Sequence, residues 1–418
     1  MESCLQVRFA QEHVAELTHE RGRSSLRYRE GAEHAVSRRL PVRPEGYAHE
    51  ACHPFFANLL PEAGFRDGLC RRLALPVKDD FTLLSLLGQD CAGAVSLSHP
   101  VQQGSESPSY APIAEAELRE WLKQPMSRPS PEKVAGLRCA ISGAQDKLVV
   151  HLVDGEPYLC ERGAPSTLIL KPDIAEDFNL IQLSALNELY CMQLAAAIGL
   201  KVPATFWFAG AFATQRFDRV SVGSRLERVH QEDFAQLLGR PPTAKYEIGW
   251  RHCFELVDLH VPDAEGARRE LIDRLFFNLL IGNADAHGKN FALLFGPHGP
   301  ELAPGYDLLC TQAYPTLSES FSMKIGPARR QEELSALAWQ ELALEARLPL
   351  DWIKQRGAEL CSKVQLALRD LGPQIVKRNP SLKTDIYPLR RRDDFLAKLA
   401  DIIVGNCKRV ARALLTRA

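Results

Sequence analysis

Four kinds of side chain that can take part in chemistry lie within a few positions of one another near residue 285. They are a carboxylate, an imidazole, an ammonium and an amide: Asp285, His287, Lys289 and Asn290. Apolar segments flank them, and we expect a helix at 276–281 and a short strand at 291–295. Holding such groups between core-forming segments costs free energy unless something binds there. Taken alone, the stretch is equally compatible with a polar turn between a helix and a strand.

A second acid, Asp307, follows the apolar segment after a turn. Phosphoryl transfer to a hydroxyl needs a carboxylate that orients the hydroxyl and accepts its proton. It also needs an Asn and an Asp that hold Mg²⁺ against the nucleotide phosphates. Asp285, Asn290 and Asp307 meet these needs in chain order. A hydrolytic metal site on Asp285 and His287 is the competing interpretation, but further ligands at metal spacing are hard to find.

Three polar sites earlier in the chain fit the same chemistry. The small-residue loop 141–147 opens into a strand and could bring backbone amides close to a phosphate, although an ordinary turn is the alternative. Lys171 lies in an apolar strand, where an ammonium needs a counter-charge such as Glu188 on the next helix, unless the strand is at an edge and the lysine reaches solvent. The segment 215–219 is compatible with a hinge or with a surface ion-pair cluster.

The elements that position these sites follow from periodicity and turn residues. We expect helices at 55–73 and 81–88, the second ending at Gly88, and a buried strand at 92–97, whereas strand signals are weak in the first fifty residues. A Ser-, Pro- and Gly-rich stretch at 102–131 contains one helix, 115–123. Strands at 148–153, 157–160, 167–172, 205–208 and 211–217 surround a long helix at 181–198. Beyond about residue 221 we expect mainly helix.

Composition describes an ordinary globular chain of several domains. The 418 residues are 45% hydrophobic and carry a formal charge of −1, which argues against a globally basic surface for nucleic acid. The 11 cysteines show no CxxC spacing, which favours free thiols in a reducing cytoplasm. The chain shows no signal-peptide pattern and no apolar run long enough to span a bilayer, so a soluble cytoplasmic protein without a membrane partner is expected.

The order of these sites resembles that of the HipA-type toxin serine/threonine kinases of bacterial toxin–antitoxin systems. The stretches 55–61 and 86–95 are similar to the family's N-terminal subdomain, and 142–147 to its phosphate loop. Asn187 and Glu188 open its helix motif, 231–233 and 245–247 match the segments after the hinge, and 282–291 matches the catalytic loop. A later strand, 322–326, belongs to the same pattern.

The resemblance implies an α+β, two-lobed protein-kinase-like fold. Its domains would be an N-terminal α/β subdomain at 1–105, a connector at 106–132, a kinase N-lobe at 133–220 and a large helical C-lobe at 221–418. It implies an enzyme that uses ATP and Mg²⁺ to phosphorylate a protein, with an aminoacyl-tRNA synthetase as the kind of target. It also implies a small helix-turn-helix antitoxin of the HipB type, through which the protein meets DNA only indirectly.

The resemblance also assigns roles to residues. Asp285 would be the catalytic aspartate, Asn290 and Asp307 the Mg²⁺ ligands, and Glu188 the ion-pair partner of Lys171. Lys171 would contact the α- and β-phosphates, Gln215 and Phe217 would lie where the hinge meets adenine, and His287 beside the nucleotide. The ATP-binding set implied is Ser142, Gly143, Ala144, Gln145, Asp146, Lys147, Lys171, Gln215, Phe217, His287 and Lys289.

Two departures from the family pattern bear on these roles. Relatives can phosphorylate a serine of their own phosphate loop, which ejects the loop and switches the kinase off. Some carry that serine two residues before Ser142, where this chain has Ala140, so Ser142 is the candidate for autophosphorylation. Gln215 replaces a hinge acid and removes a charge near the nucleotide.

Two alternative functions remain. The first is a kinase-fold corepressor that acts with an antitoxin on operator DNA, with the basic residues of 389–392 and Lys408, Arg409 and Arg412 near phosphates. The second is a small-molecule or lipid phosphotransferase.

Overall fold

The computed structural model describes residues 3–76, 79–100, 108–124, 145–174, 181–223, 225–386 and 388–416. The chain divides into two compact units. Unit 1 comprises Met1–Pro172, Gln215–Lys245 and Ala292–His298, and unit 2 comprises Asp173–Thr214, Tyr246–Phe291 and Gly299–Ala418. Each is described by itself. The domain boundaries expected from the sequence stay predictions.

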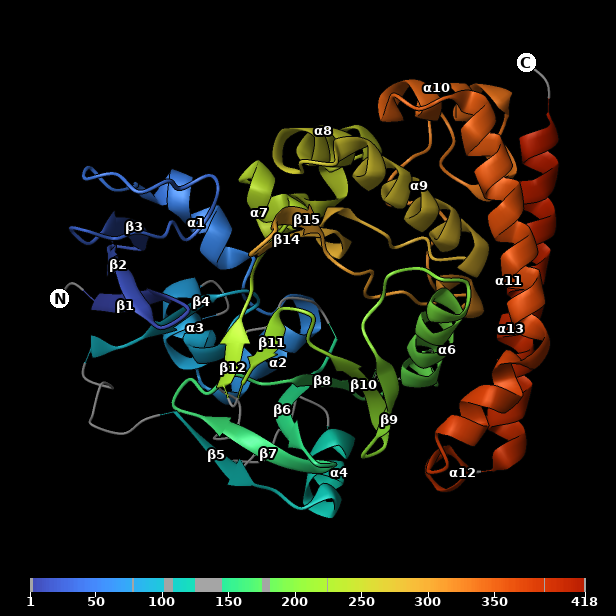
Figure 1. Cartoon of the computed structure of the whole chain (residues 1–418). Helices are drawn as coiled ribbons and strands as arrows, with labels where there is room; N and C mark the ends of the chain where they lie inside the picture. Colours follow the sequence, from blue (N-terminus) through green and yellow to red (C-terminus); the bar gives the residue numbers. More distant parts are fainter. Residues whose placement is uncertain are drawn as a thin grey trace. The chain divides into compact units, whose positions relative to one another are not determined.

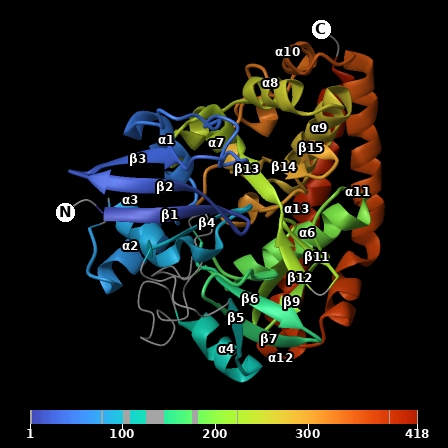
Figure 2. The same ribbon diagram turned by 60° about the vertical axis from the view of Figure 1, so that its left-hand side comes forward.

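Unit 1 begins with an antiparallel sheet whose strand order is β3-β2-β1-β4 (Figure 2). Its strands are β1 (Ser3–Phe9), β2 (Glu12–Glu20), β3 (Arg23–Tyr28) and β4 (Val95–Ser98). The expectation of little strand structure in the first fifty residues is therefore wrong. In β3 buried and exposed positions alternate, and Leu26 and Tyr28 face the core. Because one face of β3 is solvated, the strand contains few apolar residues and its sequence signal is weak. The strand forms because it pairs with its neighbour.

Three helices lie between β3 and β4 in the chain: α1 (His49–Ala57), α2 (Ala63–Arg72) and α3 (Asp80–Leu87). The single helical stretch predicted at 55–73 is wrong, because the helix is interrupted between Ala57 and Ala63. Ala63 has a φ of +46°, in the left-handed region. The predicted end of the next helix at Gly88 is confirmed. At its start the Asp79 carboxylate accepts a hydrogen bond from the Thr82 backbone N–H at 2.9 Å, a normal N-cap.

The second sheet of unit 1 runs in the order β5-β7-β6-β8. These strands are β5 (Ser109–Pro112), β6 (Leu148–Val153), β7 (Glu156–Glu161) and β8 (Leu168–Lys171). The β6–β7 hairpin turns at Asp154 and Gly155, both at positive φ, as predicted. Helix α4 (Glu115–Lys123) has the predicted bounds. Strand β5, from the stretch expected to be a connector, pairs with β7 at the edge of the sheet.

The remaining elements of unit 1 include short strands where mainly helix was expected. They are the hairpin β11 (Arg219–Val222) and β12 (Arg225–Arg228), the antiparallel pair β13 (His230–Asp233) and β14 (Ala292–Gly296), and helix α7 (Phe234–Leu238). The expectation of mainly helix beyond residue 221 is thus wrong for β11, β12 and β13, whereas β14 confirms the short apolar strand expected at 291–295.

Unit 2 is mostly helical. Its elements are α6 (Ser184–Ala197), β9 (Thr205–Phe208), β10 (Ala211–Gln215, whose last residue belongs to unit 1), α8 (Trp250–His260), α9 (Ala264–Ile281), β15 (Gly299–Leu302), α10 (Ala336–Ala346), α11 (Leu350–Arg378), α12 (Leu382–Asp385) and α13 (Leu389–Leu415). Helices α11 and α13 lie side by side, and both pack on α9 (Figure 1).

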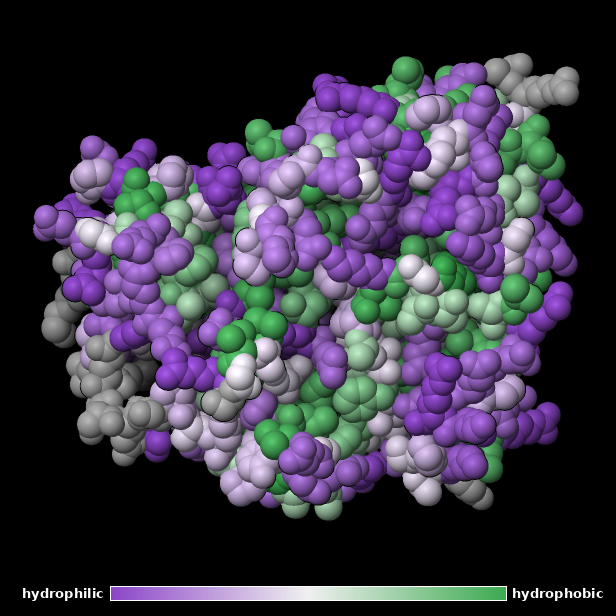
Figure 3. All heavy atoms as spheres, in the orientation of Figure 1, coloured by the Kyte–Doolittle hydropathy of each residue, from purple (hydrophilic) through white to green (hydrophobic). Residues whose placement is uncertain are grey.

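The C-terminal half of α9 is buried on all sides, with Phe276 stacked on Trp339 of α10. A helix that is apolar all round belongs in a core, so the loop that follows α9 starts from a fixed point. The strand predicted at 322–326 is wrong, because this stretch forms only an isolated bridge between Ile325 and Ala328. Hydrophilic residues cover most of the face drawn in Figure 3. Within the described ranges, the helices are all too short or too polar to cross a bilayer.

Candidate active site

The catalytic-loop candidate begins where α9 ends at Gly282. Gly282 has φ +70°, in the left-handed region, and caps the helix. A Cβ at this position would lie 2.4 Å from Gln312 Oε1 and 2.9 Å from Asn406 Nδ2. Both conformation and space therefore require glycine here. The direction in which the chain leaves α9 is fixed.

A chain of buried asparagines then shapes the loop. Asn278 Nδ2 donates to the carbonyl oxygen of Arg274 at 2.9 Å, and Asn283 Nδ2 donates to Asn278 Oδ1 at 2.8 Å. The other end of the Asn283 amide accepts from the Asp285 backbone N–H at 3.1 Å. Because Asn283 is buried, these bonds are shielded from water and hold the backbone at Asp285.

Asp285 itself is exposed, and two hydroxyl groups orient its carboxylate. Tyr246 donates its phenolic O–H to Asp285 Oδ1 at 3.1 Å, and Ser322 donates to the same oxygen at 3.3 Å. The Ser322 backbone N–H also donates to the carbonyl oxygen of Ala284 at 2.8 Å. In the part of the chain that the structure describes, the Tyr246 and Ser322 hydroxyl groups both donate to Oδ1 of Asp285. Oδ2 of this carboxylate can therefore accept a proton from a substrate.

Asn290 and Asp307, predicted as metal ligands, are brought together. Asn290 Nδ2 donates to Asp307 Oδ2 at 2.7 Å, and Asn290 Oδ1 accepts from the His287 backbone N–H at 3.0 Å. Asp307 has φ +59°, which for a residue other than glycine costs about 1–3 kcal/mol and is typical of functional sites. The surrounding structure therefore has to hold the Asp307 carboxylate in its place.

Helix α6 supplies part of that support. Asn187 Nδ2 donates to the Cys310 carbonyl oxygen at 2.9 Å, while Asn187 Oδ1 accepts from the Cys310 N–H at 2.8 Å. This paired bond fixes the backbone three residues after Asp307. Burial raises the pKa of the Cys310 thiol to about 12, so that side chain stays neutral. The role of Asn187 in the helix motif is therefore structural, because its amide holds the Cys310 backbone.

His287 and Lys289 are both buried, at 6% and 7% exposure. The His287 ring meets the Tyr246 ring edge-on, with 5.3 Å between centroids. The Lys289 carbonyl oxygen accepts from the Tyr306 hydroxyl at 2.7 Å, which ties the loop to the residue before Asp307. Gly288 between them has no room for a side chain, because a Cβ would lie 2.6 Å from Ile248 Cδ1. Nucleotide contacts of His287 and Lys289 stay predictions.

Unit 1 carries the phosphate-loop and strand-lysine candidates. Ser142, Gly143 and Ala144 lie outside the described residues. Gln145 Nε2 donates to the Pro172 carbonyl oxygen at 3.0 Å, beside the end of β8. The antiparallel register Leu148↔Leu170, extended by one residue, sets Lys147 opposite Lys171.

Lys147 and Lys171 are buried, at 8% and 9% exposure. Contacts of either lysine with a phosphate stay predictions. Asp146, which precedes Lys147, is half-buried.

The other predicted residues are placed as follows. Gln215, the last residue of β10, is exposed and Phe217 is half-buried; both belong to unit 1. Glu188 is buried in α6 of unit 2, at 2% exposure. Its predicted ion pair with Lys171 stays a prediction.

The Asn290–Asp307 pair is compatible with Mg²⁺. Mg²⁺ prefers oxygen ligands and is usually bound by one or two carboxylates together with substrate phosphates. Asp307 offers a carboxylate, and Asn290 Oδ1 has a second lone pair beside the one that accepts from His287. Among the described residues, groups of three or more His, Cys, Asp or Glu that could hold a metal are absent. The donor set fits an ion that is shared with a nucleotide.

The chain matches two protein-family models. The HipA-like C-terminal domain matches residues 139–368, more than half of the chain, and the HipA N-terminal domain matches residues 5–98. The chain belongs to the HipA family. The predicted family is therefore confirmed, and the matched regions contain every predicted site residue from Ser142 to Asp307.

Curated relatives of this HipA-family chain include "Putative kinase Y4mE" of Sinorhizobium fredii, 39% identical over 90% of this chain and 89% of its own. The "Serine/threonine-protein kinase toxin HipA" of Shewanella oneidensis is 29% identical over 65% of this chain and 66% of its own. The solved complex of Shewanella oneidensis HipA, HipB and operator DNA contains a chain with a TM-score of 0.82 and 22% identity, covering 99% of this chain and 100% of that one. The predicted α+β kinase-like fold of the HipA type is confirmed.

Sequence reasoning missed several residues that hold the HipA-family loop. Tyr246 and Ser322 were included in matching motifs but received no role, although both donate to Asp285. Asn283 and Asn187 likewise act through buried hydrogen bonds. Asparagines at buried positions next to a catalytic candidate were the available signal, because a buried amide needs partners.

Proposed function

We propose that this HipA-family chain is a Mg-ATP-dependent serine/threonine protein kinase. The observation that carries the proposal is the arrangement in unit 2. An exposed carboxylate, Asp285, is oriented through one oxygen, and Asn290 and Asp307 lie in hydrogen-bond contact five and twenty-two residues further on. Phosphoryl transfer depends mainly on positioning and electrostatic stabilisation, and the backbone at Asp285 is positioned by Asn283, which is itself held by a buried bond to Asn278.

The residues would divide the work as follows. Asp285 Oδ2 accepts the proton of the attacking serine or threonine hydroxyl, while Tyr246 and Ser322 keep the carboxylate in place. Asn290 and Asp307 would hold Mg²⁺, which neutralises phosphate charge when bound. Lys147 and Lys171 would contact the phosphates, a role that the burial of both ammonium groups supports.

The biological role that we propose is that of the toxin in a toxin–antitoxin pair. The Shewanella oneidensis structure holds HipA together with HipB and operator DNA. We propose a HipB-type helix-turn-helix antitoxin for this chain as well, with DNA contacted indirectly through it. An aminoacyl-tRNA synthetase is the proposed substrate, and autophosphorylation at Ser142 is the proposed means of inactivation.

The test is a phosphorylation assay with labelled ATP and Mg²⁺ on the purified protein, with and without an aminoacyl-tRNA synthetase. Mass spectrometry would locate phosphate on Ser142 or on the synthetase. We expect Asp285→Asn to abolish incorporation, since the amide cannot accept the proton. Glu301→Gln, which removes an exposed acid paired with Lys201, is the matched control and should retain full activity. Equal incorporation by wild type and Asp285→Asn would refute the enzymatic proposal.

A second candidate function, corepression with an antitoxin, is favoured by the same HipA–HipB–DNA structure. It predicts that this chain changes the mobility of an antitoxin–operator complex in a gel-shift assay. Asp285→Asn should change the mobility equally well, because corepression needs no phosphoryl transfer. A shift that is identical with and without this chain would remove the candidate.

A further inference from the structure

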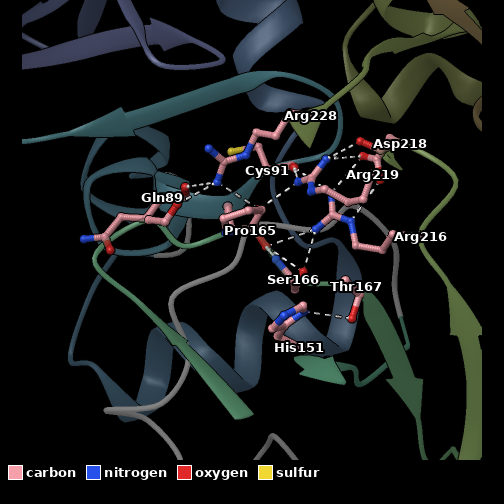
Figure 4. A network of polar contacts seen from close by, with 12 residues as sticks. Gln89, Cys91, His151, Pro165, Ser166, Thr167, Arg216, Asp218, Arg219 and Arg228 are labelled. Carbon is pink, nitrogen blue, oxygen red and sulfur yellow. Dashed lines mark hydrogen bonds and ion pairs between the residues drawn. The ribbon is translucent and has the colours of Figure 1, made fainter. Parts of the chain in front are cut away.

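A buried ion cluster lies in unit 1, apart from the residues given roles above (Figure 4). Its members, called the Asp90 cluster here, are Asp90, Arg216, Asp218, Arg219 and Arg228. Asp90 Oδ1 lies 2.7 Å from Arg219 Nη2 and 3.1 Å from Arg228 Nη2, and Asp90 Oδ2 lies 3.2 Å from Arg216 Nη1. The four side chains other than Arg228 have at most 4% exposure. The sequence was compatible with a surface ion-pair cluster at 215–219. That alternative is wrong, because Arg216, Asp218 and Arg219 are buried.

The cluster joins segments that are far apart in the chain. Asp90 ends the short 3-10 helix Gly88–Asp90 and lies in the HipA N-terminal domain, whereas Arg216 directly follows β10. Asp218 Oδ2 accepts from the Gly93 backbone N–H at 2.7 Å. Gly93 has φ +76°, and a Cβ there would lie 2.8 Å from the backbone nitrogen of Gln231. The N-terminal domain is therefore hydrogen-bonded at Gly93 to the segment after β10, and Gly93 has no space for a side chain.

The charges in the cluster depend on one another. Burial alone would raise the pKa of Asp90 and of Asp218, but the neighbouring guanidinium groups outweigh burial and lower the pKa of both carboxyls. Three cations face two anions. Removing one carboxylate would leave buried guanidinium groups without adequate compensation, which is strongly unfavourable.

The cluster fixes the backbone of the predicted hinge. Exposure alternates along this segment, with Gln215 exposed, Arg216 buried and Phe217 half-buried. The Arg216 backbone N–H donates to the Thr167 carbonyl oxygen at 2.8 Å, and its side chain bonds Asp90, Asp218, Ser166 and the Cys91 carbonyl oxygen. With Arg216 held on one side, Gln215 and Phe217 are presented on the other.

We propose that Asp90 is a positioning residue for adenine binding, so that the HipA N-terminal domain helps to set the affinity for nucleotide. The inference rests on the proposed function and on the expectation, implied by the family resemblance, that adenine lies at Gln215 and Phe217. Asp90 acts through Arg216 and does not touch the nucleotide. When the binding-competent conformation is less populated, the apparent dissociation constant rises in proportion.

The test compares Asp90→Asn with Glu62→Gln in the full-length protein. Glu62 pairs with Lys245 at 2.9 Å, also within unit 1, and its side chain is 13% exposed, so its loss removes a single, less buried ion pair that does not include Arg216. A fluorescent ATP analogue measures binding directly, and steady-state assays separate the KM for ATP from kcat. Thermal melting shows that each variant is folded at the assay temperature.

We expect Asp90→Asn to raise the dissociation constant and the KM for ATP about tenfold while kcat changes by less than about threefold, and Glu62→Gln to leave both near wild type. A merely structural role would lower the melting temperature and the active fraction without changing the KM. Unchanged nucleotide affinity in folded Asp90→Asn would overturn the inference. Absence of nucleotide binding by the wild type would instead refute the proposed kinase function.

Discussion

Gly282→Ala tests whether the end of α9 fixes the catalytic loop. The substitution puts an L side chain at φ +70°, which costs about 1–2 kcal/mol. Its Cβ would lie 2.4 Å from Gln312 Oε1, so the Gln312 amide has to move and its 2.9 Å bond from Asn406 Nδ2 is lost. Losing that bond costs about 0.5–1.5 kcal/mol more. The free energy of unfolding should fall by about 1.5–3.5 kcal/mol.

The effect on activity follows from the same geometry. Asn406 Nδ2 also donates to the Leu280 carbonyl oxygen at 3.2 Å, and the Gln312 N–H donates to the Gly282 carbonyl oxygen at 3.2 Å. A shift of Gln312 therefore displaces the backbone three residues before Asp285. A displacement of about 1 Å can lower kcat about 100-fold. Urea unfolding measures the first effect, and a kinase assay on folded protein measures the second.

Gly405→Ala is the matched control. Gly405 lies in α13 directly before Asn406, and a Cβ there meets only the Arg409 guanidinium at 3.8 Å, an ordinary contact. Alanine is a better helix former than glycine, so this variant should gain about 0.5–1 kcal/mol and keep full activity. If Gly282→Ala unfolds within about 0.5 kcal/mol of wild type and retains its kcat, the proposed rigidity of the loop is wrong.

Three further predictions concern the metal pair, the orientation of Asp285 and the pH dependence of unit 1. Asp307→Asn should raise the Mg²⁺ concentration for half-maximal activity about tenfold or more, as a magnesium titration at saturating ATP would show; an unchanged titration would contradict the metal assignment. Tyr246→Phe should lower kcat about three- to tenfold with little loss of stability, because Tyr246 is 54% exposed and donates one bond to Asp285. Because the folded-state pKa of Asp218 is lowered, its contribution to stability is present above about pH 4 and is lost as pH falls; Asp218→Asn should flatten the acid limb of unfolding measured by urea titration, and an equally steep limb would count against it.

Local signals carried much of the fold but not all of it. Helix 115–123, the hairpin around Asp154–Gly155 and the strand 205–208 were predictable because periodicity and turn residues act within a few positions. The first three strands were missed because β3 has a solvated face and depends on pairing with β2, whereas β4 overlaps the buried strand predicted at 92–97. Likewise the predicted strand at 322–326 is a turn whose Ser322 is tied to Ala284, a contact that only the folded chain creates.

The candidate site shows the same division. The roles of Asp285, Asn290 and Asp307 were proposed from residue type and chain order, and these roles stay predictions. The contact between Asn290 and Asp307 could not be derived from spacing, since it needs Asp307 in the left-handed region. Ser142 lies outside the described residues, so its phosphorylation stays a prediction.

What makes the loop rigid is supplied from distant parts of unit 2. Asn187 of α6 fixes the backbone beyond Asp307, and Asn406 of α13 holds the carbonyl of Leu280 before Gly282. Both amides are fully buried, where an unmet hydrogen bond costs more than a met one contributes. Each amide therefore has one acceptable arrangement, and that arrangement sets one end of the loop. The 3-10 turn Gly288–Asn290 lies between those ends, which explains how an exposed carboxylate at Asp285 keeps a defined position without being buried itself.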